Sequence, residues 1–500
     1  MSQRQLKEAF VSNLTGTGLL EISLGMAVAP LCLLCRGLLL VLCQLRCGRP
    51  LARPRGVLLD LALLVSPLLF SCTVLAPVIY LVPTILAAFC AGIFSKIYSQ
   101  SCTRAPLRQM VEDFQEMRLD ADYVSAVTVF RVYINVLTSI GILAVDFPQF
   151  PRRYAKTETY GTGAMDVGVG AFIFGNALVC PEVRQRACEV QPKFSSLAKQ
   201  VFSIWPLVFL GVGRLLSVKS IEYHEHTSEY GVHWNFFFTL ALVRAAASLL
   251  LAVFPKNKSW IVAVNLAVLY QLTLNTTSLK AFVLHGSDGR DTRAGFLNAN
   301  REGLLSLFGY LAIYMASVQV GLYVLQRRST VREWLRALGV LLLAALTLFT
   351  LLDCSQRWAD PVSRRMANLS YCLWVVAHCL LLFACFLVAD LVLLFTQLLV
   401  KGCAVPSCWS AVKPPVKRGA EAAPGSGAGE LQHLCLIAAI NKNQLLFFLL
   451  ANVMTGVVNL TIDTMHSEAA VTLCILHLYM VFNCLVMYAL HAKNIVLKFW

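Results

Sequence analysis

The chain has 500 residues; 58% are hydrophobic, only 14% are charged, and the formal net charge is +15. Soluble domains contain about 45–50% apolar and about 25% charged residues, so this composition excludes an ordinary soluble protein. It indicates an all-α polytopic membrane protein. The positive charge does not indicate nucleic-acid binding, because no basic run is interleaved with aromatic residues in a soluble module.

Apolar segments long enough to cross a bilayer follow one another along the chain, and each such helix needs about 20 residues. They predict about 13 transmembrane helices in one bundle, a single multi-span membrane domain over residues 1–500. The predicted spans lie near 20–43, 57–75, 77–97, 123–145, 163–180, 200–218, 233–254, 259–284, 303–326, 333–352, 367–400, 443–461 and 468–491.

The connecting segments carry information on topology. When the N-terminus is placed on the non-cytosolic side, the cytosolic segments hold about twice as many Lys and Arg residues as the opposite segments, which favours this orientation and a cytosolic C-terminus. Residues 411–432 are rich in Pro, Gly, Ala and Ser and predict a disordered cytosolic linker. Segment 98–122 spaces its apolar residues at three and four, which predicts an amphipathic helix on the membrane surface.

Five polar segments fall on the predicted non-cytosolic side. They are residues 146–166, 219–235, 285–303, 353–368 and 459–467. Charged residues at a membrane boundary must be paired or solvated, so their convergence on one face predicts a site for a polar substrate. The alternative is that each segment is only a solvated cap of the bundle.

The first of these segments, DFPQFPRRYAKTETYGTGAMD, holds the best chemical pair, Asp146 and Lys156. Asp146 ends a predicted span, where partial desolvation raises the pKa of a carboxylate and a nearby ammonium lowers it. Such a carboxylate is a candidate general base for a sugar-like hydroxyl, and Lys156 could orient it or stabilise an oxyanion. A structural ion pair that closes the helix end remains the other interpretation.

Candidate substrate-binding residues lie in the same segment, in other polar segments and, for Arg214, within a predicted span. Four arginines are candidate phosphate ligands, because guanidinium groups match phosphate oxygens, although arginines at a membrane surface also contact lipid head groups. These are Arg152, Arg153, Arg364 and Arg365. The remaining candidates are Tyr160, Asp166, Arg214, Glu229, Tyr230, His233, Trp234, Asn235, Asn298, Asn300, Arg301 and Asn368. No metal site is predicted, because the cysteines do not show the spacing of zinc ligands.

The run AVDFPQFPRRYAKTETYGTGAMDVGVGAFIFGNALV (144–179) resembles the inositol acyltransferases of glycosylphosphatidylinositol (GPI) anchor synthesis. This is the family of the phosphatidylinositol-glycan class W protein and of the fungal GPI-anchored wall transfer protein. Further similar stretches are residues 7–17, 205–215, 229–240, 297–304, 363–371 and the terminal Phe499–Trp500. The resemblance therefore runs from end to end.

The resemblance implies a multi-span enzyme of the endoplasmic reticulum membrane. Such an enzyme transfers a fatty acyl chain, usually palmitoyl, from acyl-CoA to the inositol 2-hydroxyl of glucosaminyl-phosphatidylinositol. It implies that Asp146 and Lys156 are the catalytic pair, that acyl-CoA is a co-substrate, and that no cofactor is bound permanently. The expected partners are acyl-CoA, glucosaminyl-phosphatidylinositol and the lipid bilayer. On composition alone, a polytopic transporter of lipids or small molecules is the alternative, and a non-catalytic scaffold is a further one.

Overall fold

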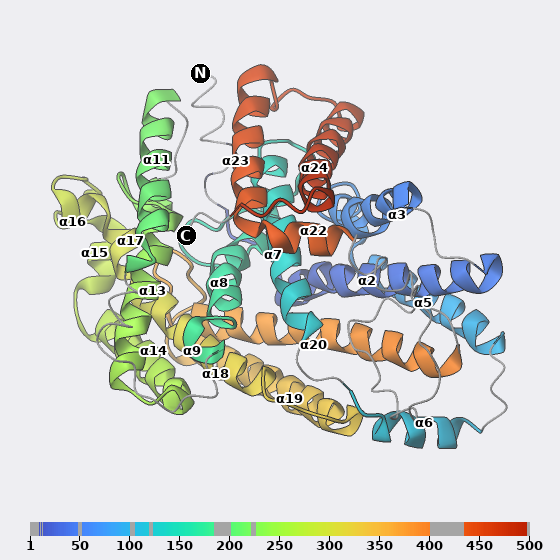
Figure 1. Ribbon diagram of the computed structural model, residues 1–500. Coiled ribbons are helices and arrows are strands. Elements are labelled where there is room, and N and C mark those ends of the chain that lie inside the picture. Colours follow the sequence, from blue (N-terminus) through green and yellow to red (C-terminus); the bar gives the residue numbers. More distant parts are fainter. Residues whose placement is uncertain are drawn as a thin grey trace.

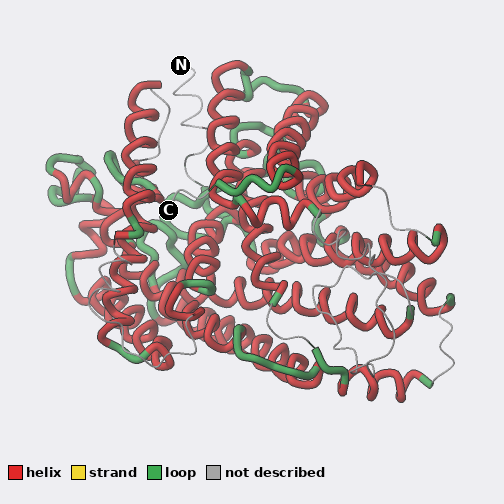
Figure 2. Tube along the Cα trace, viewed as in Figure 1, coloured by secondary structure: helices red, strands yellow, loops and turns green. Residues whose placement is uncertain are grey.

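The structure is a computed structural model that describes residues 10, 12, 14–48, 53–100, 106–119, 124–184, 202–221, 227–400 and 435–497. Over these ranges the chain is helical, and extended pairing is limited to two isolated bridges, Gly16 with Thr162 and Arg118 with Thr330. Figure 2 shows the helices joined by loops. The prediction of an all-α polytopic membrane protein is confirmed. The predicted linker 411–432 lies outside the described residues.

Nine helices in the described part of the chain are long and apolar enough to cross a membrane. They are α2 (Leu19–Cys47), α5 (Val82–Ser99), α7 (Ser125–Ala144), α13 (Phe236–Val253), α17 and α18 together (Arg301–Leu305 and Leu307–Val324), α19 (Val331–Trp358), α20 (Leu369–Leu399), α23 (Gln444–Thr461) and α24 (Ala469–Ala492). Each coincides with a predicted span. The predicted number of 13 is not confirmed by this count.

The four other predicted spans are helical but shorter, interrupted or more polar. They correspond to α3, a π-helical turn and α4 (Arg53–Asp60, Leu61–Val65 and Ser66–Ser71), to α8 (Ala164–Ala177), to α11 (Trp205–Ile221), and to α14 and α15 (Ser259–Thr276 and Leu279–His285). Glycines and prolines break or shorten helices, and polar residues such as Asn265 and Gln271 lower the hydropathy of α14.

The helix α20 is the central element of the fold. It packs against α2, α7, α8, α18 and α19, and Figure 1 shows it running through the middle of the molecule. Its aromatic residues Tyr371, Trp374, Phe383 and Phe386 are fully buried. A helix that is apolar all round is buried on all sides, so this helix organises the bundle around itself.

The amphipathic helix predicted in segment 98–122 is present as α6 (Leu107–Glu116). Its apolar residues Met110 and Phe114 are buried, and the Phe114 ring meets Phe395 of α20 edge to face at 5.1 Å. Helix α6 also packs against α19. Protein covers Met110 and Phe114, whereas Val111 of the same apolar face is 39% exposed, so the placement of this helix on the membrane surface stays a prediction.

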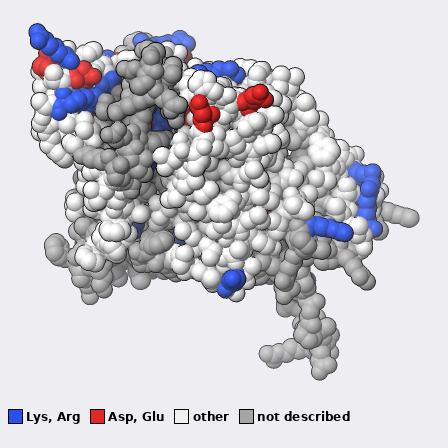
Figure 3. Space-filling view, turned by 90° about the horizontal axis from the view of Figure 1, so that it is seen from above, with Lys and Arg blue, Asp and Glu red and all other residues white. Residues whose placement is uncertain are grey.

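Figure 3 shows a face of the molecule that is mostly free of charged side chains, with Lys, Arg, Asp and Glu gathered near its margins. Large apolar side chains are exposed on several spans, for example Leu269 on α14 and Leu343 on α19, which are 60% and 65% exposed. Exposing so many apolar side chains to water is unfavourable, whereas exposing them to the hydrocarbon of a bilayer is not. The exposed apolar residues therefore face lipid.

Candidate active site

The loop between α7 and α8, residues 145–163, is held in place by two distant parts of the chain. The Thr17 amide donates to the Thr162 carbonyl at 2.6 Å, and the Gly161 amide donates to the Val362 carbonyl at 2.8 Å. Gly16 and Gly161 have φ angles of +83° and +125°, and a Cβ atom on either would clash with the facing backbone. Glycine is needed at both positions because the backbone segments around Gly16 and Gly161 pass so close to each other.

The five polar segments meet, as the sequence predicts. They are joined by the side-chain bonds Asp146–Asn459 (2.7 Å), Lys156–Glu229 (2.6 Å), Asp166–Arg364 (2.7 Å) and Arg365–Glu302 (2.8 Å), and by the bond from the His233 amide to Asn300 (2.8 Å). We call this layer the polar platform, made of residues 145–166, 229–235, 285–303, 359–368 and 459–467. It covers the ends of α7, α8, α13 and α20.

Asp146 lies just beyond the end of α7 and is half-buried. Its Oδ2 accepts a hydrogen bond of 2.7 Å from Nδ2 of Asn459, which is on α23. The other side-chain atom of Asn459, Oδ1, is buried and has no hydrogen-bond partner among the described residues. A buried acceptor left without a donor is costly, so a ligand hydroxyl at this position would satisfy it.

Lys156 forms an ion pair with Glu229, at 2.6 Å between Nζ and Oε1. Glu229 belongs to the short helix α12 (Thr227–Tyr230), and its carboxylate also lies 3.8 Å from Nη1 of Arg364. Burial opposes ionisation of Glu229, but the charges of Lys156 and Arg364 outweigh it and lower the pKa of Glu229 to about 2. Glu229 is therefore a permanent anion that fixes the Lys156 ammonium. The catalytic pairing of Lys156 with Asp146 stays a prediction.

Arg364 connects this ion pair to the start of α8. Its Nε donates to Oδ1 of Asp166 at 2.7 Å, whereas its buried Nη1 has no hydrogen-bond partner among the described residues. Asp166 is fully buried and also accepts bonds from the amides of Thr157 (3.1 Å) and Gly163 (3.0 Å). Asp166 therefore caps α8 and anchors the loop, and the open donor of Arg364 remains for a ligand.

The two arginines of the loop, Arg152 and Arg153, are used largely to shape it. Arg152 donates to the carbonyl groups of Phe147 and Phe150, both at 2.9 Å, and lies over the ring of Phe10 at 3.9 Å. Burial lowers the pKa of Arg152 to about 10, although Asp146 acts in the opposite direction. Arg153 donates to Oε1 of Glu21 on α2 at 2.8 Å. The phosphate-binding role predicted for them stays a prediction.

Several other predicted binding residues have their polar groups occupied by the protein itself. Arg301 is fully buried and donates to the Val283 carbonyl (3.1 Å), to Asn298 Oδ1 (3.1 Å) and to Asp291. Asn235 and Asn368 accept backbone amide bonds at the first turns of α13 and α20. Asparagine is a preferred residue at helix starts because its oxygen satisfies open amides. These contacts favour a structural role for the three side chains.

Of the remaining candidates, four belong to the polar platform and Arg214 lies outside it. The Trp234 indole donates to Thr239 at 3.0 Å, burial raises the pKa of Tyr230 well above its ordinary value, and the side chains of His233 and Arg214 are exposed. The Tyr160 ring lies 5.9 Å from the Lys280 ammonium. Among the described residues, no group of His, Cys, Asp and Glu is placed to hold a metal ion.

Sequence reasoning missed three acidic or amide side chains that organise the site. Glu21 and Glu302 are buried partners of Arg153 and Arg365, and Asn459 is the partner of Asp146. Glu21 could have been noticed, because an acidic residue within an apolar span needs a partner. Nothing in the local sequence distinguishes Asn459 from an ordinary polar residue at a helix end.

The chain matches the GWT1 family over residues 3–490. It is 49% identical to the glucosaminyl-phosphatidylinositol-acyltransferase PIGW of Bos taurus and 46% identical to that of Homo sapiens, over 100% of both chains in each comparison. It is 34% identical to the GPI-anchored wall transfer protein 1 of Aspergillus fumigatus, over 98% of this chain and 97% of the relative. The resemblance found in the sequence is thus confirmed, and the chain belongs to the GWT1 family.

Proposed function

We propose that this protein is a glucosaminyl-phosphatidylinositol acyltransferase of GPI-anchor biosynthesis. It transfers a fatty acyl chain, palmitoyl in the usual case, from acyl-CoA to the inositol 2-hydroxyl of its lipid substrate. The full-length identity of 49% to a relative of that name is the observation that carries the proposal. The enzyme works in the endoplasmic reticulum membrane, with the N-terminus and the polar platform in the lumen and the C-terminus in the cytosol.

In the proposed reaction Asp146 is the general base. Its carboxylate takes the proton of the inositol 2-hydroxyl while the hydroxyl oxygen attacks the carbonyl carbon of the acyl-CoA thioester. The C–S bond then breaks, the new ester remains on inositol, and the proton passes to the departing CoA thiolate. The bond from Asn459 to Asp146, at 2.7 Å, would keep the second carboxylate oxygen directed at the hydroxyl.

Lys156 stabilises the oxyanion that develops on the thioester carbonyl. Its bond to Glu229 keeps the ammonium in one place, and a fixed donor needs no reorganisation when the negative charge appears. The Lys156 side chain is 36% exposed, so a substrate can approach it. No permanently bound cofactor takes part in this scheme.

The lipid phosphate is assigned to arginines that have open donors. Nη1 of Arg364 and Nε of Arg365 are both buried without a hydrogen-bond partner in the described part of the chain. A phosphate oxygen would satisfy either group with a charge-assisted bond. The acyl tail lies between apolar helices, where each buried CH₂ group contributes about 0.8 kcal/mol.

The test uses the purified protein in detergent with radiolabelled palmitoyl-CoA and glucosaminyl-phosphatidylinositol, beside the Asp146→Asn variant. We expect acyl transfer by the wild type and a loss of about 100-fold or more in the variant, which keeps the shape of the side chain but not the base. Near-normal transfer by a folded variant would rule out the base role. If neither protein transfers an acyl chain while liposomes show lipid movement, the protein is a transporter.

A further inference from the structure

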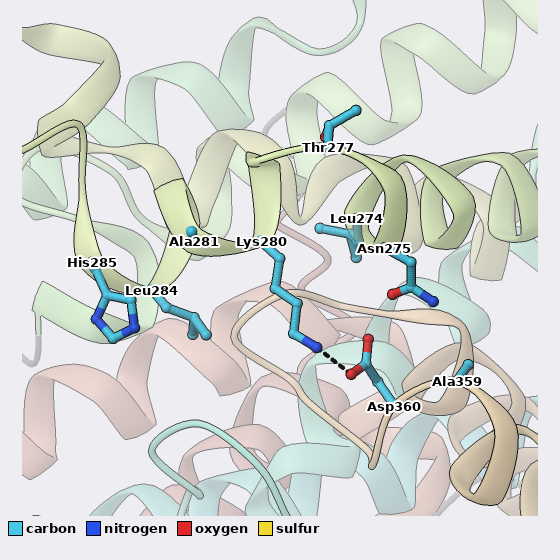
Figure 4. Close-up of a pocket in the computed structure, with 9 residues that line it drawn as sticks. All are labelled: Leu274, Asn275, Thr277, Lys280, Ala281, Leu284, His285, Ala359 and Asp360. Carbon is cyan, nitrogen blue, oxygen red and sulfur yellow. Dashed lines mark hydrogen bonds and ion pairs between the residues drawn. The ribbon is translucent and has the colours of Figure 1, made fainter. Parts of the chain in front are cut away.

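A cavity of about 550 Å³ opens at the edge of the polar platform, between α14, α15 and the loop that follows α19. Figure 4 shows its lining residues, with Lys280 and Asp360 joined by an ion pair and Asn275 and His285 on either side. No predicted site residue lines it. The cavity therefore adds residues to the site that the sequence did not predict.

The wall of the cavity presents one positive and one negative charge. The Lys280 ammonium donates to Oδ1 of Asp360, whose Oδ2 accepts a bond of 2.8 Å from Gln271. The Lys280 side chain is 34% exposed and that of Asp360 is 7% exposed. Each carboxylate oxygen has two lone pairs, so Asp360 retains capacity for a further donor. The pair is thus open to a ligand on one side.

The cavity also lies at the boundary between lipid and the polar platform. Leu269 and Leu272 on the outer side of α14 are 60% and 52% exposed, and Trp358, two residues before Asp360, is 89% exposed. On the other side, Lys280 lies near the ring of Tyr160, which is four residues from Lys156 in the catalytic loop. The cavity therefore has exposed apolar residues on one side and the loop that carries Lys156 on the other.

The Lys280–Asp360 ion pair in the cavity wall is complementary to a ligand that carries one positive and one negative group. The ammonium group of such a ligand can replace Lys280 at Asp360. Its phosphate, assigned above to Arg364 and Arg365, can then accept a further bond from the released Lys280 ammonium, because Arg365 donates to the carbonyl of Leu284, a residue that lines the cavity. An anionic lipid without an amine would leave the Asp360 carboxylate facing a negative group. The pair therefore discriminates by repulsion as well as by attraction.

We propose that this cavity binds the amino-sugar end of the zwitterionic lipid substrate, and that Asp360 selects for a free primary amine. The proposal rests on the proposed function and adds the residue that reads the glucosaminyl group. Phosphatidylethanolamine has the same pair of charges but no sugar, so it is the natural competitor to compare.

The test measures KM and kcat with glucosaminyl-phosphatidylinositol and with its N-acetylated form. For Asp360→Asn we expect KM for the free amine to rise about tenfold, the size of one lost charge-assisted bond, with little change in kcat. The preference of the wild type for the free amine should shrink by the same factor. Ala281→Trp fills the cavity from an exposed position, and it should raise KM similarly if Asp360→Asn fails to fold.

The matched control is Asp353→Asn. Asp353 also pairs with a cation, Arg357 at 2.8 Å, but both side chains are more than half exposed and neither lines the cavity. This variant should keep the wild-type KM.

Three results would overturn the proposal: unchanged KM in both cavity variants, equal use of the N-acetylated lipid by the wild type, or equal competition by phosphatidylethanolamine vesicles. Failure of the proposed function is a separate result, since the wild type would then transfer no acyl chain. In that case, equilibrium binding of short-chain glucosaminyl-phosphatidylinositol to wild type and Ala281→Trp decides the question, with equal binding counting against the cavity.

Discussion

Replacing Glu229 by Gln removes the anion that holds Lys156 while keeping the shape of the side chain. Burial opposes ionisation of this carboxyl, yet the charges of Lys156 and Arg364 lower its pKa from an ordinary 4.5 to about 2. A pKa unit corresponds to about 1.4 kcal/mol, so the folded protein stabilises the carboxylate by roughly 3 kcal/mol. Because the Lys156 side chain is 36% exposed, water replaces part of the lost partner. We therefore expect a destabilisation of about 1–3 kcal/mol at neutral pH.

The pH dependence has a definite sign. The pKa of Glu229 is lower in the folded protein, so its stabilisation is complete above pH 4.5 and is lost as the pH falls toward about 2. Thermal unfolding of the detergent-purified proteins should show a constant difference in stability between wild type and Glu229→Gln from about pH 5 to 8. This difference should become smaller below about pH 5. Glu158→Gln, at an exposed position of the loop that carries Lys156, is the control for removing a charge. A stability difference that stays constant or grows at low pH would show that the ionised Glu229 carboxylate is not its cause.

Two further predictions concern the catalytic loop. Asn459→Ala removes the side-chain amide that donates a hydrogen bond to Asp146. In the acyl-transfer assay we expect kcat to fall about tenfold, with KM nearly unchanged. An equal fall in kcat for the matched surface variant Asn265→Ala would show that the effect is not specific to Asn459. Gly161→Ala places a Cβ atom against the Thr15 carbonyl at a φ of +125°. We therefore expect the free energy of unfolding, measured by thermal unfolding, to fall by about 2 kcal/mol or more. The control is Gly339→Ala, which has open space around it and should be neutral.

The architecture was predictable because it depends on composition along the chain. Apolar runs define the spans, and the polar segments between them can gather only where the helices end. The meeting of the segments 146–166, 353–368 and 459–467 therefore follows from topology. The number of spans was harder to predict. The apolar run at 163–180 is helical for only 14 residues in α8, because the helix ends at Ala177, shortly before Pro181.

Individual partners were not predictable, because they depend on distances in three dimensions. Lys156 and Asp146 are ten residues apart in sequence and were expected to pair, whereas the ion pair of Lys156 is with Glu229, 73 residues away. The pairing of Arg153 with Glu21 joins residues 132 positions apart. Charge and spacing identify which residues need a partner, but the packing of helices decides which partner each one meets.

The polar platform contains two kinds of buried polar groups, and the difference between them points to the ligand. Arg301, Asp166 and Asn368 have their groups satisfied by the protein, and buried ion networks of this kind give more rigidity than stability. In contrast, Oδ1 of Asn459 has no hydrogen-bond partner among the described residues, and Nη1 of Arg364 has none either, although it lies 3.8 Å from the Glu229 carboxylate. Asn459 bonds to Asp146, and Arg364 lies beside the Glu229 carboxylate that holds Lys156. We therefore predict that a polar lipid head group would supply the missing hydrogen bonds of Asn459 and Arg364.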